Sequence, residues 1–553
     1  MLPPAGDIND PLGFLSLASL SQLLTPGLGL IATLVAILVA QYVRSPWRRV
    51  PPGPKGLPVL GNALQVQNKD WMFGRECKRK FEHIMYLNAL GQPIIVIHSL
   101  KAAFELIDRR ANIYSDRPRF IVAQELFCGG LFPALLSYGD VWRRVRRAAH
   151  EVLTKVAVRD YHPVYRKEAI LLAAGMLETP DASDKHIQRS SASATMSILY
   201  DYPTLENEHD KNFMGIHAFV DRMSAAAAPG AYLVESFPWM LHIPARFAKW
   251  KREGIEHFKR HSSMFNGLLD TVSNDIVSRY FPHSLNILES LSFQAKGSER
   301  PSVSASLMKN SNRSGLSNTE IAWLLGGLYT AGAETSANTL AWWTRAMIAH
   351  PEIQKRAQDE LDAVVGRSRA PTFADAPNLP YIQALVKESL RWRPAFPFSI
   401  PHSTSEDDWY EGMFIPKGTI CLINLWQCHH DPSSYGPDAA SFNPERFLDE
   451  EGGLIPGPVE TRDDGHGTYG FGRRACVGKH AANDLLFINI ATVLWAVQLK
   501  CSRDEDGKEI PVDLETDDYS GMIFRPPAYR CKVTPRFPEA PLLLMEELEL
   551  LKA

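Results

Sequence analysis

The stretch TYGFGRRACVGKHAAND, residues 468–484, places one of the chain's seven cysteines between a glycine-rich basic turn and a helix. Gly470, Gly472 and Gly478 surround Cys476, and such a composition favours a tight loop. Beyond Gly478, apolar residues recur at near-helical spacing. We therefore expect Cys476 on a loop that feeds a helix N-terminus, where free N–H groups and the helix dipole favour an anionic sulfur.

The composition of the whole chain is ordinary for a globular protein. The 553 residues are 45% hydrophobic and 22% charged. A formal net charge of −3 and the absence of a basic tail argue against a nucleic-acid partner. The seven cysteines are scattered and odd in number, which is typical of reduced thiols in a cytosol-facing protein.

The N-terminal segment predicts a membrane anchor. No residue between Asp10 and Arg44 is charged, and 27–43 is the most apolar part. Acidic residues precede it and basic residues follow, so the positive-inside rule places the remainder of the chain in the cytoplasm. We expect a single-pass anchor in residues 1–47, with its span at about 26–43. A cleaved signal peptide is disfavoured because no basic n-region precedes the apolar part.

A proline-rich segment, RRVPPGPKGLPVLGN at 48–62, follows the anchor. Proline fixes φ and removes backbone donors, so this segment is expected to be a stiff hinge. No repeat or long linker follows, and 63–553 is predicted to form one large domain. Most of its segments have helical patterns, and 93–98 and 418–423 are strand candidates.

The longest predicted helix begins at the capping box formed by Ser317 and Glu320. Its middle carries Gly332, which costs about 1 kcal/mol relative to alanine. Glu334 and Thr335 follow directly, and an acid beside a hydroxyl suggests a proton relay next to a ligand. Close packing of helices at a small-residue patch is the alternative explanation.

Three further motifs are weak when each is taken alone. Glu388 and Arg391 share one face of a predicted helix, and a proline-bounded Glu-Arg pair follows in 443–447. Trp142 and Arg146 lie one helical turn apart, so an indole N–H and a guanidinium could together hold a carboxylate or phosphate. A basic surface helix is the alternative for this last pair.

Taken together and in this order, these pieces resemble the cytochrome P450 family of haem-thiolate monooxygenases. The resemblance covers nearly the whole chain, from the anchor and hinge through W-x-x-x-R, A-G-x-E-T, E-x-x-R and P-E-R-F to the cysteine loop. It implies the P450 fold, mainly α with small β-sheets, behind an N-terminal transmembrane anchor. One position departs from the family pattern, because Tyr469 stands where phenylalanine is usual and its hydroxyl needs a partner.

The resemblance also implies the cofactor site. Cys476 would be the axial thiolate ligand of iron in haem b (iron protoporphyrin IX), donating electron density that favours O–O cleavage. The preceding glycines, Gly472 among them, would bring backbone N–H groups to the sulfur and tune its donor strength. Four side chains would hold the haem propionates: Arg474, Trp142, Arg146 and His402.

Catalytic and supporting roles follow from the same resemblance. Glu334 and Thr335 would deliver protons during dioxygen activation, while Ala331 and Gly332 would leave space for oxygen and substrate. A buried charge network supporting the cysteine loop would be formed by Glu388, Arg391 and Arg446.

The expected partners are a lipophilic substrate, a membrane and an electron donor. Apolar segments at 120–132, around Phe396 and Phe398, and at 519–524 would surround the substrate. No dinucleotide-binding fingerprint is present, so an NADPH-dependent flavoprotein reductase would supply electrons. Its docking patch would consist of Arg143, Arg144, Arg147 and Lys479.

The predicted function is insertion of one oxygen atom from O₂ into a terpenoid, polyketide or indole-like metabolite at the endoplasmic reticulum membrane. The first alternative is a thiolate-haem isomerase or dehydratase acting on a peroxide without O₂. The second is a non-catalytic haem-binding membrane protein. A zinc site at Cys476 and His480 is disfavoured because the spacing to Cys421, Cys428 and His429 fits no standard zinc motif. Residues 280–296 fit the family poorly, and would be a membrane contact, an extra packing element or a retained intron.

Overall fold

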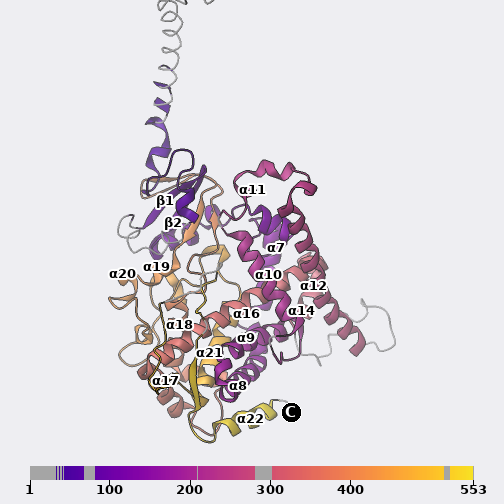
Figure 1. The fold of residues 1–553 in the computed structure, drawn as a ribbon, viewed down its shortest axis with the longest axis vertical. Coiled ribbons are helices and arrows are strands. Elements are labelled where there is room, and N and C mark those ends of the chain that lie inside the picture. The colour runs from indigo at the N-terminus through magenta and orange to yellow at the C-terminus, as the bar shows by residue number, and fades with distance from the viewer. Residues whose placement is uncertain are drawn as a thin grey trace, which may run out of the picture. The chain divides into compact units, whose positions relative to one another are not determined.

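The computed structural model describes the chain from residue 43 to 551 apart from several gaps, together with a few residues before it (Figure 1). The described residues are 33, 36–37, 40–41, 43–67, 81, 83–207, 209–228, 230–280, 302–515, 523–527 and 529–551. Most of the predicted span at 26–43, and residues 281–296, lie outside them. Among the described residues, no helix combines the length and apolarity needed to cross a membrane.

The described chain divides into two compact units. The first comprises the N-terminal residues to Pro51 together with 407–416, and the second comprises 52–406 and 417–553. In the first unit, strands β4 (Asp408–Tyr410) and β5 (Met413–Ile415) pair antiparallel, and the ring of Trp47 meets that of Phe414 edge-on at 6.1 Å.

The second unit is mainly helical, as predicted. Its longer helices are α7 (Asp140–Val152), α8 (His162–Glu178), α9 (Ser183–Tyr200), α10 (Lys211–Ala227), α12 (Lys249–Tyr280), α16 (Asn318–Ala349), α17 (Pro351–Val364), α18 (Pro380–Trp392), α21 (Lys479–Ala496) and α22 (Ala540–Leu550). Helix α16 packs against α9, α12, α18 and α21, and most of its residues are buried. It is therefore the central element of the core.

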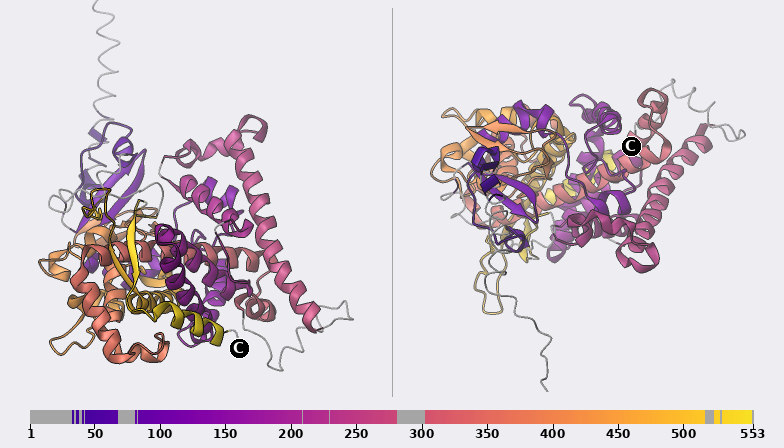
Figure 2. Two further views of the ribbon diagram at one scale, coloured as in Figure 1. Left: turned by 60° about the horizontal axis from the view of Figure 1, so that its bottom comes forward. Right: turned by 90° about the horizontal axis from the view of Figure 1, so that it is seen from above.

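A four-stranded sheet in the order β1-β2-β6-β3 lies on the side of the second unit away from α12 (Figures 1 and 2). Its strands are β1 (Ile84–Ala89), β2 (Gln92–Ile97), β6 (Ile420–Ile423) and β3 (His402–Ser403). The two predicted strand segments become β2 and β6, which pair parallel although more than 300 residues separate them. A second pair, β7 (Val497–Cys501) with β8 (Cys531–Pro535), is antiparallel.

The local helix signals are confirmed. Ser317 and Glu320 form the expected reciprocal capping box at the start of α16. The W-x-x-x-R and E-x-x-R motifs lie on α7 and α18, and the cysteine loop leads into α21 at Lys479. The predicted mainly helical fold with small sheets is therefore correct.

Candidate active site

Cys476 lies on a loop that backbone hydrogen bonds close before α21 begins. Its N–H donates to the Tyr469 carbonyl at 2.7 Å. Gly472 has a left-handed φ of +65°, and a Cβ atom there would lie 2.3 Å from the Ile107 carbonyl oxygen. Glycine is thus required at 472 because the loop packs directly on the backbone of a neighbouring turn.

The backbone N–H that approaches the sulfur comes from Gly478, which follows the cysteine. The N–H of Gly470 donates to the Gly467 carbonyl, and that of Gly472 donates to the Asp108 carboxylate, both at 2.9 Å. Gly470 and Gly472 thus use their own N–H groups elsewhere, and the expectation that these glycines let backbone N–H groups approach the sulfur stays a prediction.

The Cys476 side chain is exposed in this structure. Desolvation by the surrounding protein raises the pKa of its thiol, and the Gly478 N–H and the positive charge of Arg146 lower that pKa by less. These contributions favour the thiolate only in part, and the expected anionic sulfur stays a prediction. A coordinating metal ion deprotonates a thiol outright, so bound iron would provide the missing stabilisation.

The Tyr469 hydroxyl, the one departure from the family pattern, has a partner. It donates to Asn483 Oδ1 at 2.6 Å, and burial raises the pKa of the phenol well above its usual value. The tyrosine is thus accommodated as a neutral, hydrogen-bonded side chain that ties the loop to the first turns of α21.

Arg474 and Trp142 lie together beside the cysteine loop. The guanidinium of Arg474 lies 4.5 Å above the indole ring and donates to the carbonyls of Ser115 and Leu136, at 2.8 and 2.7 Å. Its buried Nη1 atom has no hydrogen-bond partner among the described residues. An orphaned cationic donor is costly in a protein interior, so this atom is suited to an anionic ligand.

Two more guanidinium groups, those of Arg146 and Arg117, contribute positive charge near Arg474. The pKa of Arg474 is lowered to about 10, mainly by burial; Asp116 opposes this shift and the nearby charge of Arg146 adds to it. Burial also lowers the pKa of Arg117 well below its usual value, with a contribution from Arg474. Arg117 was not predicted from the sequence. It donates to carbonyls of segments far apart in the chain, at Ala134, Ile400 and Pro401.

His402 lies on β3, close to this cluster, and its Nδ1 donates to the Tyr114 carbonyl at 2.8 Å. Burial, with Arg117 and Arg474, lowers its pKa well below the usual value, so the imidazole is neutral and Nε2 carries a lone pair. His402 can therefore hold a carboxylate only as an imidazolium, a form that an approaching carboxylate would favour.

Arg146 differs from the other predicted propionate ligands. Its guanidinium donates to the Ala475 carbonyl, directly before the cysteine. This places Arg146 against the loop, where its charge favours the thiolate.

The donor set fits a haem. A dicarboxylate group would meet an orphaned guanidinium N–H, further cationic side chains and an indole, and a cysteine on the adjacent loop would supply a sulfur ligand. The assignments of Cys476, Arg474, Trp142, Arg146, His402 and Gly472 to the cofactor remain predictions, now with a geometry that suits them.

The middle of α16 borders accessible space. From Ile321 to Ile348, all of which the structure describes, Ala331 is the only exposed residue. A Cβ at Gly332 would lie 3.2 Å from Thr195 on α9, so this glycine serves close helix packing. The two explanations of the small-residue patch thus apply to adjacent residues. Gly332 allows close helix packing, and Ala331 borders open space.

Glu334 and Thr335, the predicted proton-relay residues, have partners in this structure. Thr335 Oγ1 donates to the Ala331 carbonyl at 2.7 Å, one helical turn earlier. The Glu334 carboxylate pairs with Nδ1 of His217 on α10, and both side chains are largely buried, at 14% and 27% exposure. This contact was not predicted, because the two residues lie in different motifs and 117 positions apart.

The predicted buried charge network is present. Arg391 and Glu388 form a bidentate pair with N–O distances of 2.6 and 2.7 Å, and neither side chain is exposed. Arg446 Nε reaches the same carboxylate at 3.3 Å. Arg391 also donates to the His429 carbonyl, and the His429 ring accepts from the Gly467 N–H. The network therefore connects α18 to the start of the cysteine loop, the structural role that was expected.

Other nominated residues have simpler surroundings. Phe524 is buried and stacks on Trp342 at 5.4 Å, so it belongs to the core. Cys421 and Cys428 are buried in β6 and in the short helix α19 (Leu425–His429). In the part of the chain that the structure describes, no three His, Cys, Asp or Glu side chains form a metal-binding group.

Comparison with known proteins identifies the family. The family model for cytochrome P450 matches residues 51–530. This chain belongs to the cytochrome P450 family. A cytochrome P450 monooxygenase of Armillaria gallica is 48% identical over 517 residues, covering 94% of this chain and 96% of that protein.

Two further P450 relatives are also fungal. Cytochrome P450 monooxygenase 58 of Postia placenta is 43% identical over 522 residues, covering 94% of each chain. Cytochrome P450 monooxygenase iboC of Amanita muscaria is 36% identical over 548 residues, covering 91% of this chain and 94% of that protein. The chain is thus a P450 monooxygenase, an oxidoreductase, and its family implies a haem-thiolate cofactor.

Proposed function

We propose that this P450 monooxygenase inserts one oxygen atom from O₂ into a lipophilic small molecule, with Cys476 as the haem ligand. The observation that carries the proposal is the exposed Ala331 in the buried span of α16, with Glu334 and Thr335 directly after it. Such an arrangement suits a reaction that needs both a substrate space and proton transfer. The isomerase and carrier alternatives have no need of this acid–hydroxyl pair.

Bound haem supplies the activation of dioxygen, which thiolate ligation promotes. Cys476 holds the metal from a loop fixed by the Tyr469 carbonyl, and the Gly478 N–H and Arg146 moderate the charge on its sulfur. Arg474, with its orphaned N–H, binds a carboxylate of the cofactor and so orients it.

Proton movement depends on α16. Thr335 can rotate its hydroxyl from the Ala331 carbonyl toward the substrate space, where it accepts and donates protons. Glu334 exchanges protons with solvent through its small exposed part, and His217 holds its carboxylate in place. The pair thus forms a relay from solvent to the substrate space.

The proposed substrate class is a terpenoid, polyketide or indole-like specialised metabolite. The fungal origin of the relatives supports this class. Comparing metabolite extracts from the source organism with and without this gene tests it. We expect a precursor to accumulate that is one oxygen atom lighter than a lost product, whereas unchanged profiles would contradict this substrate class under the conditions used.

The decisive test of the reaction uses Thr335→Ala, with Thr335→Ser as the matched control. Both purified variants are expected to show the red-shifted Soret band of a carbon monoxide complex with thiolate ligation. Thr335→Ala is expected to lower product formed per NADPH by about tenfold, within the range of one proton-transfer group, while serine retains most coupling. Equal coupling in all three proteins would contradict the relay, and a missing Soret band would contradict the haem assignment.

Electrons are proposed to come from an NADPH-dependent flavoprotein reductase. The four basic residues nominated for docking are partly neutralised, because Arg143 pairs with Asp140 at 2.6 Å and Lys479 with Asp464 at 3.1 Å. Arg144 similarly approaches Glu320 at 3.4 Å. Arg147 is exposed and has no ion-pair partner among the described residues, so we propose it as the centre of the docking face.

The proposed location is the endoplasmic reticulum membrane, with a single pass and a cytoplasmic catalytic domain. The uncharged segment between Asp10 and Arg44 supports it. Fluorescence microscopy of the tagged full-length chain, with and without residues 1–47, tests the proposal. Identical diffuse distributions for both proteins would overturn it.

A further inference from the structure

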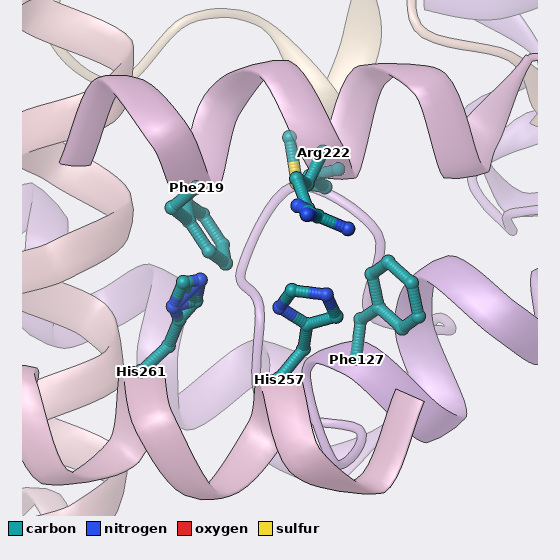
Figure 3. Close-up of a pocket in the computed structure, with 6 residues that line it drawn as sticks. Phe127, Phe219, Arg222, His257 and His261 are labelled. Carbon is teal, nitrogen blue, oxygen red and sulfur yellow. The ribbon is translucent and has the colours of Figure 1, made fainter. Parts of the chain in front are cut away.

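A small cavity lies between α10 and α12 and contains no residue of the predicted active site. Its volume is about 120 Å³, and its lining residues are Gly215, Ala218 and Arg222 from α10 and His257, Arg260, His261 and Met264 from α12. Two imidazoles rise from α12 toward α10, with the Arg222 guanidinium opposite them (Figure 3). By the same measure one water needs about 10–15 Å³, so the cavity has room for a group of several heavy atoms.

The two histidines form the floor of this cavity. His257 and His261 are only 8% and 5% exposed, and their ring centroids lie 5.8 Å apart on successive turns of α12. Phe127 and Phe219 each pack on one of the imidazoles at 4.9 Å. Among the described residues, neither buried Nδ1 atom has a hydrogen-bond partner.

The environment selects one tautomer of each imidazole. Burial lowers the pKa of both histidines, to about 4 for His261, so both are neutral near pH 7 and carry one ring proton. A buried N–H without an acceptor is rarer and costlier than an unpaired lone pair. We therefore place the proton on Nε2, which is not among the buried atoms without a partner, so that the two histidines offer two N–H donors.

The rim carries positive charge. Arg222 and Arg260 are exposed, and neither has a hydrogen-bond or ion-pair partner in the described part of the chain. Both guanidiniums lower the pKa of His257, so both charges lie near that ring, while Glu256 and Glu253 oppose them more weakly. This field disfavours a metal cation, which a histidine pair on successive helical turns could otherwise bind.

We infer that this cavity is a binding site for a small oxyanion, a phosphate group held by the imidazole N–H donors of His257 and His261 and the guanidiniums of Arg222 and Arg260. Charge-assisted hydrogen bonds from guanidinium to phosphate are among the strong polar contacts in proteins. A bound phosphate would bridge α10 and α12 and stabilise their packing. A free phosphate and a phospholipid head group present the same chemistry.

Inorganic phosphate is the first probe, titrated into the full-length haem protein in detergent against sodium chloride of equal ionic strength. Calorimetric binding is compared among the unaltered chain, Arg222→Gln, Arg260→Gln and Lys259→Gln. Lysine 259 is an exposed neighbour on α12 that does not line the cavity, so its variant controls for loss of one charge. We expect affinity to fall about tenfold in each arginine variant and to stay within about twofold in Lys259→Gln.

A second arm identifies the source of the phosphate. Vesicles containing phosphatidic acid replace the free anion, and phosphatidylcholine vesicles provide the comparison. Arginine-dependent binding of free phosphate supports a soluble ligand, and arginine-dependent binding of phosphatidic acid alone supports a lipid head group. Equal binding by all four proteins, or no binding of either probe, would overturn the inference. A His257→Phe variant, which keeps the ring packing, is expected to weaken binding by about tenfold through loss of one donor.

Discussion

At the scale of single residues, Tyr469 shows how a departure from the family pattern is accommodated. The phenol reaches Asn483 Oδ1 at 2.6 Å, while its backbone carbonyl accepts the Cys476 N–H. The side chain thus directs its hydroxyl toward α21. We expect the hydroxyl to stabilise the loop without changing the donor strength of the sulfur.

Replacing Tyr469 with phenylalanine is expected to lower the free energy of unfolding by about 1 kcal/mol, because one hydrogen bond is lost. The Soret maximum of the carbon monoxide complex should stay unchanged. Asn483→Ala should lower the free energy of unfolding by about 1 kcal/mol more in the unaltered chain than in the Tyr469→Phe background. Only in the unaltered chain does the change leave a buried tyrosine hydroxyl without an acceptor. Thermal unfolding and difference spectra measure both; a shifted Soret band in Tyr469→Phe would show that the hydroxyl tunes the sulfur after all.

Residues that carry chemistry within a local motif could be predicted from the sequence, whereas their tertiary partners could not. Cys476 and Glu388 are recognisable because their neighbours along the chain define the motif. Arg117 carries no such signal, and its carbonyl partners at Ile400 and Pro401 come from a segment over 280 positions away. The Gly478 N–H was missed because local composition does not specify where each backbone group points.

At the scale of elements, the contact between α10 and α16 links two helices through the predicted proton-relay acid. His217 pairs with Glu334, and Phe213 packs on the imidazole with ring centroids 4.3 Å apart. A largely buried charge-assisted contact of this kind contributes more than an exposed ion pair. The contact therefore restricts the orientation of the Glu334 carboxylate and the position of α10.

A double-mutant cycle tests this contact. His217→Ala is expected to lower the free energy of unfolding by about 1–3 kcal/mol, because it leaves Glu334 without its partner. In a Glu334→Gln background the same change should cost at least 1 kcal/mol less. Denaturant unfolding of the four proteins gives the coupling energy. Additive effects of the two changes would mean that the pair contributes nothing to stability.

Elements with strong periodicity were predicted correctly from local signals. These signals do not specify how the elements pack against one another. The capping box and the apolar run are sufficient to define α16, since both are local signals. Pairing of β2 with β6 depends on segments more than 300 residues apart, and the cavity between α10 and α12 depends on how two helices pack. Glu334 and Thr335 could be singled out because a glycine stands beside them in the middle of a long predicted helix, but the His217 partner of Glu334 required the fold.

At the scale of the whole molecule, the buried charge network holds together segments that are distant in sequence. Arg391 donates to Glu388 and to the carbonyls of His429, Ala439 and Ser441. Each guanidinium nitrogen is used, in a geometry that an ammonium group cannot reproduce. The pair is therefore needed for the fold that presents the cysteine loop.

Arg391→Lys is expected to destabilise the protein by about 3–5 kcal/mol and to yield little folded, haem-bound material. The matched control is Arg356→Lys, which alters an ion pair with Glu445 whose side chains are 48% and 59% exposed. That control should change stability by less than about 1 kcal/mol. Soluble yield and the carbon monoxide difference spectrum measure both variants, and comparable losses in the two would contradict a special role for the buried pair.

Buried neutral histidines predict that the molecule is unstable in acid. Burial lowers the pKa of His261 to about 4 and that of His466 to about 3, against a usual value near 6.5 in the unfolded chain. Between pH 6.5 and 4 the unfolded state therefore binds more protons than the folded state, and stability must fall as the pH falls. Each such histidine contributes at most about 1.4 kcal/mol per pH unit in this window.

The unfolding free energy should therefore decrease from pH 6.5 toward pH 4 more steeply in the unaltered protein than in His261→Phe, which cannot take up that proton. Phenylalanine keeps the contacts with the neighbouring Phe219 and Phe265 rings, so packing changes little. Denaturant unfolding at several pH values in this range gives both slopes, and their difference should approach one proton. Parallel slopes would mean that His261 already titrates in the folded protein, and that the α10–α12 cavity is open enough to solvent to accept a charged imidazole.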